Sequence, residues 1–208
     1  MKKITSLLIL TTVMMTLMLS GCKKGENDPF FSLKSRTGRL SQEWTLSEEN
    51  ITTVSKSSWS GTTYTTTRTY SYDGTNETVT TTTSSGGNST TNTSTYTYSL
   101  IYSFDKDGTY TITEIVDGEK TVTEGTWMWV EGNKDIDLKN KEAIMLTVTK
   151  ITYSDGEVTT YTGVSYLHGV ILLDELSGDR LVMKYDYSNV DSDGDTYTKT
   201  GTKTFEKK

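Results

Sequence analysis

The chain has 208 residues, of which 33% are hydrophobic, and its formal net charge at pH 7 is −6. One cysteine excludes a disulfide scaffold and a cysteine-ligated zinc site, one histidine excludes a histidine metal cluster, and the acidic balance excludes the basic surface that nucleic-acid binding requires. About one residue in five is threonine, and only Ala143 is alanine. Because β-branched and aromatic side chains favour sheets over helices, this composition predicts an all-β protein.

The first 21 residues have the pattern of a signal peptide. Lys2 and Lys3 precede an apolar stretch at 4–19 that is too short and too rich in hydroxyl groups to span a bilayer. It ends in Leu-Ser-Gly-Cys at 19–22, which resembles the bacterial lipobox. Cys22 is therefore expected to carry a diacylglyceryl group on its thiol and an acyl chain on its new amine, which together anchor the chain in a membrane. The alternative is a chance cysteine after an ordinary signal peptide.

Residues 22–37 are predicted to form a lipidated, polar tether, which contains the only proline. Lys23 is not the aspartate that marks inner-membrane retention under the enterobacterial rule, so we expect an outer-membrane location, on either the periplasmic or the surface face. Residues 38–208 are long enough to form one domain with a substantial core.

A short helical turn is predicted at 32–40, and Gly38 is placed to end it. The apolar side chains around this turn are expected to plug one end of the domain. They are Phe30, Phe31, Leu33 and Leu40.

The body of the chain alternates between apolar and polar residues and is divided by turn signals. Asp-Gly pairs at 73, 107, 117, 155 and 193 are typical of hairpins whose turn residues have positive φ. Strands are expected at 43–46, 51–59, 62–72, 76–83, 93–104, 109–116, 120–131, 142–153, 157–167, 169–174, 180–187 and 195–206. Sequential hairpins without a crossover helix predict an antiparallel up-and-down β-barrel, because closure removes the free sheet edges.

The alternation also predicts which side chains share a face. Near 149–150 the apolar phase switches, which indicates a β-bulge. Trp127 and Trp129 share one face and Met128 takes the other, so we expect one face to line the barrel and the other to pack on a neighbour.

Residues 75–95 depart from this pattern, because Val79 is their only aliphatic residue. Such a segment cannot fix itself in a core, so it is predicted to project as a hairpin. It is either a glycan-binding or O-glycosylated hairpin, or a solvated ribbon tip with loose register.

Three motifs follow one another behind the lipobox. They are Leu-Ser-Gln-Glu-Trp-Thr-Leu at 40–46, Tyr110 followed by Gly-Thr-Trp at 125–127, and the acidic-leucine hairpin at 171–183. In this order they resemble the lipocalin-like lipoproteins common in Bacteroidota. The resemblance implies an eight-to-ten-stranded calycin-type barrel, in a family whose members mostly have no assigned ligand. The insertion at 75–95 departs from the compact pattern of that family.

Candidates for catalysis and metal binding are few. His168 lies in an apolar run, which favours a strand residue over a catalytic base. Asp174 and Glu175 are expected on opposite faces of a strand, which suits acid–base chemistry poorly. Three aspartates at 191–195 resemble the front half of a calcium loop, but Thr202 stands where the bidentate glutamate is required, so a hairpin turn is favoured. We therefore expect no enzyme, no metal and no cofactor.

The aromatic residues are the remaining candidates for function. One interpretation is a pocket for a small amphipathic or hydrophobic ligand in the barrel mouth, and the other is a filled core. A second possible function is a cell-surface interaction or glycan-binding module that uses the Thr/Tyr-rich hairpin, with the barrel as scaffold. The residues expected to line the pocket are Trp44, Tyr98, Tyr102, Tyr110, Trp127 and Trp129.

Overall fold

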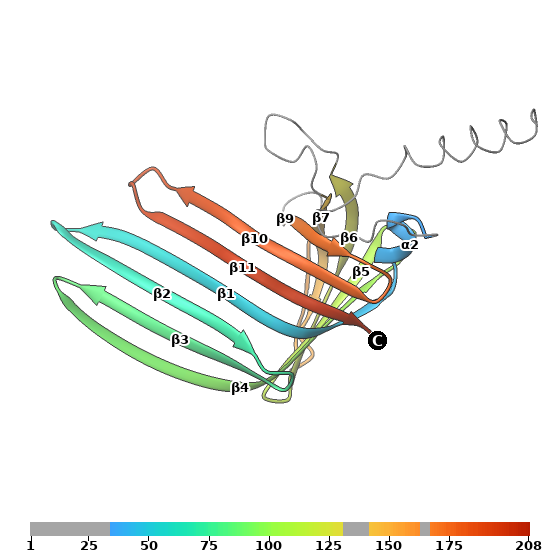
Figure 1. Ribbon diagram of the computed structural model, residues 1–208, viewed down its shortest axis with the longest axis horizontal. Coiled ribbons are helices and arrows are strands. Elements are labelled where there is room, and N and C mark those ends of the chain that lie inside the picture. The colour runs from blue at the N-terminus through green and yellow to red at the C-terminus, as the bar shows by residue number, and fades with distance from the viewer. Residues whose placement is uncertain (1–33, 131–141, 163–166) are drawn as a thin grey trace, which may run out of the picture.

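The computed structural model describes residues 34–130, 142–162 and 167–208. Several predicted features lie outside the described residues. They are the signal peptide, Cys22, the tether before Lys34, and the expected plug residues Phe30, Phe31 and Leu33. Figure 1 shows a barrel from which several long strands extend to one side. The described elements are α2 (Arg36–Leu40), β1 (Glu43–Trp59), β2 (Thr62–Tyr72), β3 (Asn76–Ser85), β4 (Asn88–Phe104), β5 (Thr109–Val116), β6 (Glu119–Val130), β7 (Glu142–Thr152), β8 (Val158–Thr160), β9 (Leu167–Leu176), β10 (Arg180–Val190) and β11 (Thr196–Lys207).

Ten of these strands form a closed antiparallel barrel. They follow the order β6-β5-β4-β3-β2-β1-β11-β10-β9-β7, and pairing of β7 with β6 closes the ring. The short strand β8 pairs with the end of β7 and is not one of the ten barrel strands. The predicted fold class, an all-β, up-and-down barrel with a short N-terminal helical turn, is confirmed.

The barrel is narrower at one end, because β1 and β4 pair directly there. Trp44 lies opposite Tyr102 in this pairing, which bypasses β2 and β3. Towards the other end the β2–β3 hairpin lies between β1 and β4 and separates them. Its turn points to the narrow end, at the place where the direct pairing of β1 with β4 stops. The Asp73 carboxylate accepts hydrogen bonds from the backbone N–H groups of Asn76 (2.7 Å) and Thr75 (2.9 Å), which fix this turn and lower the pKa of Asp73.

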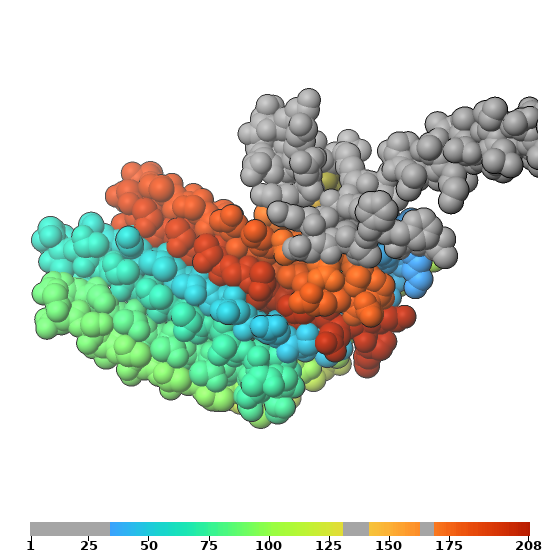
Figure 2. All heavy atoms as spheres, viewed as in Figure 1, coloured from blue at the N-terminus to red at the C-terminus, as the bar shows by residue number. Residues whose placement is uncertain are grey.

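At the wide end six strands continue beyond the barrel. This projecting sheet consists of residues 50–59, 62–71, 78–97, 186–190 and 196–202, and Figure 2 shows it as a broad surface. β3 and β4 pair without a register shift from Asn76 and Thr97 to Ser85 and Asn88. The predicted projecting hairpin is thus part of a six-stranded sheet, in which β3 and β4 pair in one continuous register.

Hydroxyl pairs across β3 and β4 explain how so polar a hairpin keeps its register. Thr80 and Thr93 Oγ1 atoms are 3.2 Å apart, and Thr82 and Thr91 Oγ1 atoms are 3.0 Å apart. Such directly opposed pairs stabilise one register over its neighbours, in place of the burial that fixes register in a core strand.

The hydrophobic core fills the narrow end. Alternating residues of each strand point inward, and α2 closes this end from outside through Leu40, which is fully buried. The other core side chains include Trp44, Leu46, Phe104, Tyr110, Trp127, Ile144, Leu146, Leu176, Leu181, Met183 and Phe205.

Several local predictions are confirmed. The glycines of all five Asp-Gly pairs have positive φ, between 82° and 98°. Val148 pairs with Gly125 whereas Lys150 pairs with Glu124, so Thr149 is the predicted bulge.

Other local predictions are wrong. Gly38 lies inside α2, which is capped at its start by Ser35 and ends at Leu40, with Ser41 as its C-cap. The expected strands 43–46 and 51–59 are one strand, because a bulge beside Glu48 lets β1 continue. Met128 is 55% exposed, so the Trp127 face of β6 is the buried one.

Candidate functional site

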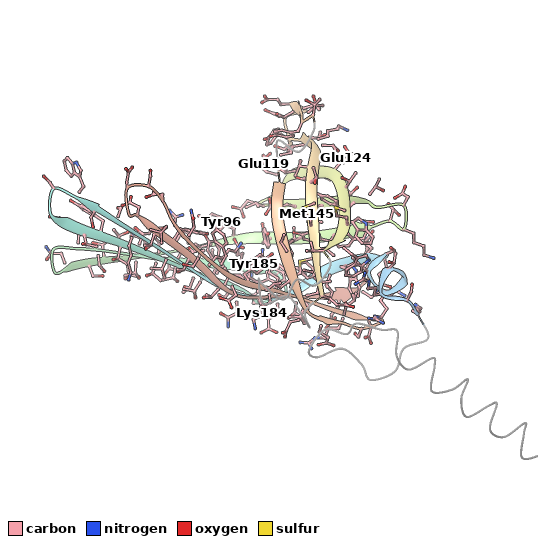
Figure 3. The ribbon with its side chains drawn as sticks, turned by 90° about the horizontal axis from the view of Figure 1, so that it is seen from above. Tyr96, Glu119, Glu124, Met145, Lys184 and Tyr185 are labelled. Atoms are coloured by element: carbon pink, nitrogen blue, oxygen red, sulfur yellow. The ribbon has the colours of Figure 1, made fainter. Side chains whose placement is uncertain are left out.

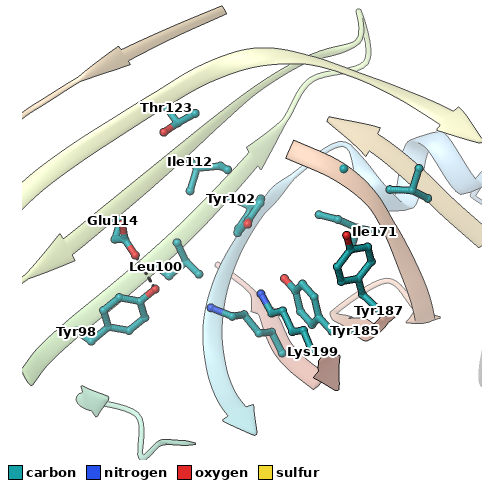
Figure 4. Close-up of a pocket in the computed structure, with 13 residues that line it drawn as sticks. Tyr98, Leu100, Tyr102, Ile112, Glu114, Thr123, Ile171, Tyr185, Tyr187 and Lys199 are labelled. Atoms are coloured by element: carbon teal, nitrogen blue, oxygen red, sulfur yellow. Dashed lines mark hydrogen bonds between the residues drawn. The ribbon is translucent and has the colours of Figure 1, made fainter. Parts of the chain in front are cut away.

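Above the core, the wide half of the barrel contains a cavity of about 680 Å³ that is partly open to solvent. This volume is typical of small-molecule sites. Figure 4 shows Tyr98, Ile112 and Glu114 on one wall, facing Tyr185 and Lys199 on the other. The lining residues are Tyr98, Leu100, Tyr102, Ile112, Glu114, Thr123, Gly169, Val170, Ile171, Tyr185, Tyr187, Lys199 and Lys203.

The deep part of the cavity is apolar. Leu100, Ile112 and Ile171 are each at most 7% exposed and come from β4, β5 and β9. They point inward because each occupies the same parity as the core residues of its strand. This floor can bury the apolar part of a ligand.

Polar groups stand on the wall above the floor. Tyr98 Oη donates a hydrogen bond of 2.9 Å to Glu114 Oε1, and its ring packs edge-on against Tyr72. Burial, reinforced by the nearby Glu114 carboxylate, raises the pKa of Tyr98, so its hydroxyl stays protonated and acts as a donor. The hydrogen bond thus holds the Glu114 carboxylate in one orientation, in which it can accept a hydrogen bond from a ligand.

A buried ion pair crosses from β1 to β11 beside the cavity. Lys203 Nζ lies 3.1 Å from Glu49 Oε1, and both side chains are largely buried. Glu77, from β3, stands next to this pair. Burial, and then the Glu49 charge with a hydrogen bond between the two carboxyl groups, raise the pKa of Glu77 to about 7. The Glu77 carboxyl group is therefore partly protonated at neutral pH.

Lys199 supplies a cation at the cavity rim. Its Nζ lies 4.1 Å from the centroid of the Tyr185 ring, a cation–π contact. Burial, and then the Lys203 charge, lower the pKa of Lys199. Among the described residues no carboxylate forms a salt bridge with Lys199, so its charge is available to an anionic group of a ligand.

Glu77→Gln is expected to change the pH dependence of stability. The unfolded carboxyl titrates near 4.5 and the folded one near 7. Between these values the folded protein holds a proton that the unfolded chain has released, so wild-type stability falls as the pH rises through this window. The variant should match the wild type below about pH 5 and exceed it by about 1 kcal/mol above about pH 7, since solvent screens a half-buried group. Urea unfolding at both pH values checks this, with exposed Glu119→Gln as the control. A wild-type stability that rises through the window contradicts it.

The structure divides the six residues predicted to line the pocket. Tyr98 and Tyr102 line the cavity. Trp44, Tyr110 and Trp127 are at most 7% exposed and fill the narrow end. In contrast to the predicted lining, these three side chains belong to the hydrophobic core and are not among the residues that line this cavity.

The indole N–H groups explain why the tryptophans take these places. Trp44 Nε1 donates to the Leu40 carbonyl oxygen (2.9 Å) and Trp127 Nε1 donates to the Asp105 carbonyl oxygen (3.0 Å). Trp129 is also not in the lining, because it packs outside the cavity against α2. Its Nε1 donates to Thr37 Oγ1 (3.0 Å), and the Arg36 guanidinium carbon lies 4.5 Å from its ring.

Sequence reasoning missed the charged residues of the cavity. Charged residues are usually exposed, so the sequence alone predicts a solvent-facing position for Glu114, Lys199 and Lys203. Their parity was the available indication: Lys203 is two residues from inward-facing Phe205, and Glu114 is two residues from Ile112. The shared face of Tyr185 and Tyr187 with Met183 was visible in the alternation.

The structure describes the catalytic and metal-binding candidates only in part. His168 lies on β9, and its side chain is not among those described. The Asp191 carboxylate accepts hydrogen bonds from the backbone N–H groups of Asp193 (3.0 Å) and Asp195 (2.9 Å), which confirms the predicted hairpin turn. The described ranges contain no group of three or more His, Cys, Asp or Glu side chains that could hold a metal ion.

No family model, curated protein or solved structure matches the chain. Within the described ranges, no helix has the length and apolar character needed to cross a membrane.

Proposed function

We propose that this protein is a non-catalytic binding lipoprotein of the lipocalin-like type, which holds a small amphipathic ligand in its barrel. The observation that carries the proposal is the cavity of about 680 Å³ with an apolar floor and a polar rim. The floor of Leu100, Ile112 and Ile171 suits an apolar body, and Lys199 suits a polar or anionic end. No cofactor, metal or nucleic acid takes part.

The proposed location is the outer membrane. Lipidation of Cys22, supported by the Leu-Ser-Gly-Cys pattern at 19–22, would tie the barrel to that membrane through a short polar tether. The barrel would then meet its ligand in the periplasm or at the cell surface.

Cys22→Ser is expected to release the protein from the membrane. Without the thiol no thioether to diacylglycerol can form, so several acyl chains are lost together. Fractionation of cells should find the variant in the soluble fraction, and palmitate labelling should disappear. Lys23→Ser, which changes the neighbouring side chain, should leave both unchanged. Labelling that persists in Cys22→Ser refutes the anchor.

Filling the cavity is expected to abolish ligand binding. We choose indole-3-acetate, a water-soluble amphipathic acid, as probe and the full chain in detergent micelles as protein, with micelles alone as the blank. The Leu100→Trp side chain occupies the cavity, so calorimetric affinity should fall at least tenfold. Thr123→Trp fills the same space from a half-buried position and should act alike.

The matched control is Met128→Trp, which adds the same ring to an exposed position outside the barrel. It should bind indole-3-acetate as the wild type does. Wild-type binding by a folded Leu100→Trp or Thr123→Trp variant, or no binding by the wild type, would contradict the proposed function.

A second candidate function is the cell-surface or glycan-binding module. One observation favours it: of the ten large hydrophobic side chains that are exposed in the described part of the chain, five lie on one face of the projecting sheet. A monomeric surface rarely gathers such side chains on one face without a partner.

A further inference from the structure

The two faces of the projecting sheet carry different residues. Directly paired residues share a face, so the strand registers define transverse rows. The outer face is a lattice of hydroxyl groups. One of its rows, which is threonine on five successive strands, consists of Thr200, Thr52, Thr69, Thr80 and Thr93.

The inner face, which continues the cavity wall outward, carries the aromatic residues. We call it the tyrosine face and define it by Trp59, Tyr64, Tyr70, Tyr96, Tyr187 and Tyr197. Trp59 is 74% and Tyr187 53% exposed. Figure 3 shows Tyr96 and Tyr185 where the projecting strands meet the barrel. From Glu49 to Trp59 the face is roughly 30 Å long at the rise of a β-strand.

The middle of the tyrosine face is positively charged, although the chain as a whole is acidic. Lys199 and Arg68 flank Thr53 on the neighbouring strands, so their Cα atoms are about 10 Å apart. Tyr197, two residues from Lys199 on β11, lies near Arg68 and beside Tyr187, and the centroids of the two tyrosine rings are 6.1 Å apart. In the described residues neither cation is in a salt bridge. The row that holds both contains no acidic residue: Tyr187, Lys199, Thr53, Arg68, Thr81 and Asn92.

We propose that the tyrosine face binds an acidic oligosaccharide, with Arg68 and Lys199 holding carboxylate or sulfate groups of neighbouring sugars. The inference deepens the second candidate function and does not depend on a ligand in the cavity. Charge complementarity selects an anion, because two unpaired cations flank one strand and the adjoining rows also lack acidic residues.

The neutral side chains of this face select a sugar chain over a lipid. Exposed tyrosine rings can stack on the C–H faces of pyranose rings, while their hydroxyl groups remain hydrogen-bonded to water or sugar. Between the rings the face offers Thr81, Thr83 and Asn92 for hydrogen bonds. Its aliphatic residues are few, chiefly Ile51 and Val79, so an acyl tail would gain little burial there.

The test measures calorimetric binding of galacturonic acid oligomers to the full chain in detergent micelles. The comparison ligand is the same oligomer after reduction of its carboxyl groups, which keeps ring number and linkage and removes the charge. We expect the charged oligomer to bind at least tenfold more tightly, with an advantage that declines as salt is added.

Three variants locate the binding. Arg68→Gln and Lys199→Gln should each weaken binding of the charged oligomer about tenfold, because each removes a charge-assisted hydrogen bond. Lys56→Gln removes the same charge from the outer face of the same sheet and should change affinity less than twofold. Arg68 and Lys56 are both exposed, so these two variants are expected to fold alike.

Leu100→Trp separates this proposal from the cavity function, because it should abolish indole-3-acetate binding and leave oligomer binding unchanged. Equal affinity for the reduced oligomer, an equal loss in Lys56→Gln and Arg68→Gln, or equally tight binding of single-stranded DNA would each overturn the proposal. Oligomer binding that disappears in a folded Leu100→Trp variant would assign it to the cavity and overturn the proposal as well.

Discussion

Gly201→Ala is expected to destabilise the protein by about 3–5 kcal/mol, a large part of the stability of a single domain. Gly201 has a φ of +124°, which L side chains rarely adopt, and it lies where β11 passes from the barrel into the projecting sheet. A Cβ atom there would lie 2.0 Å from the Asn50 carbonyl oxygen, a backbone atom of the paired strand. Neither β1 nor β11 can move away without breaking their pairing, so the steric clash and the backbone strain both lower the free energy of unfolding.

The matched control is Gly178→Ala in the β9–β10 turn. Nothing lies within 4 Å of a Cβ atom at that position, so its effect should stay within about 0.5 kcal/mol. Urea unfolding of both variants measures the difference. A Gly201→Ala variant as stable as Gly178→Ala would mean that β1 and β11 are not in the described register.

Trp44→Ala is expected to cost about 4–5 kcal/mol and to lower the melting temperature by about 10–20 °C. The Trp44 side chain is fully buried at the narrow end, where β1 pairs directly with β4. Its loss leaves a large cavity and also removes the hydrogen bond from Trp44 Nε1 to the Leu40 carbonyl oxygen. The narrow end would then lose packing and one of its contacts with α2.

Trp44→Phe separates these contributions, because it keeps a buried ring and loses the N–H group. It should cost about 1–3 kcal/mol, clearly less than the alanine variant. Thermal unfolding followed by near-UV circular dichroism measures both. If Trp44 lined a ligand pocket as first expected, Trp44→Ala would weaken ligand binding with little loss of stability.

The barrel could be predicted from the sequence because its strands combine two independent patterns. Apolar residues alternate along β4, β7 and β10, and Asp-Gly pairs mark the turns between strands. Both patterns follow from local geometry. Side chains of a strand alternate between its two faces, and tight hairpin turns require residues with positive φ. The bulge at Thr149 was visible for the same reason.

The register and full extent of the projecting sheet could not be predicted, although its hairpin was, because β2 and β3 carry no apolar alternation. Register there depends on cross-strand hydroxyl pairs such as Thr80 with Thr93. Because nearly every position of these strands is a threonine or serine, the sequence does not show which two hydroxyl groups pair. The charged cavity wall was missed for a different reason. Glu49 and Lys203 are tolerated inside because they pair with each other, and sequence alone does not show which opposite charges meet.

A crystal structure of the full chain with bound indole-3-acetate tests the central claim most directly, that the wide half of the barrel is a ligand cavity. We predict density for one molecule, its indole ring on Leu100, Ile112 and Ile171 and its carboxylate towards Lys199. A cavity closed by its own side chains, or a molecule bound only on the outer surface beside Met128, would contradict that claim.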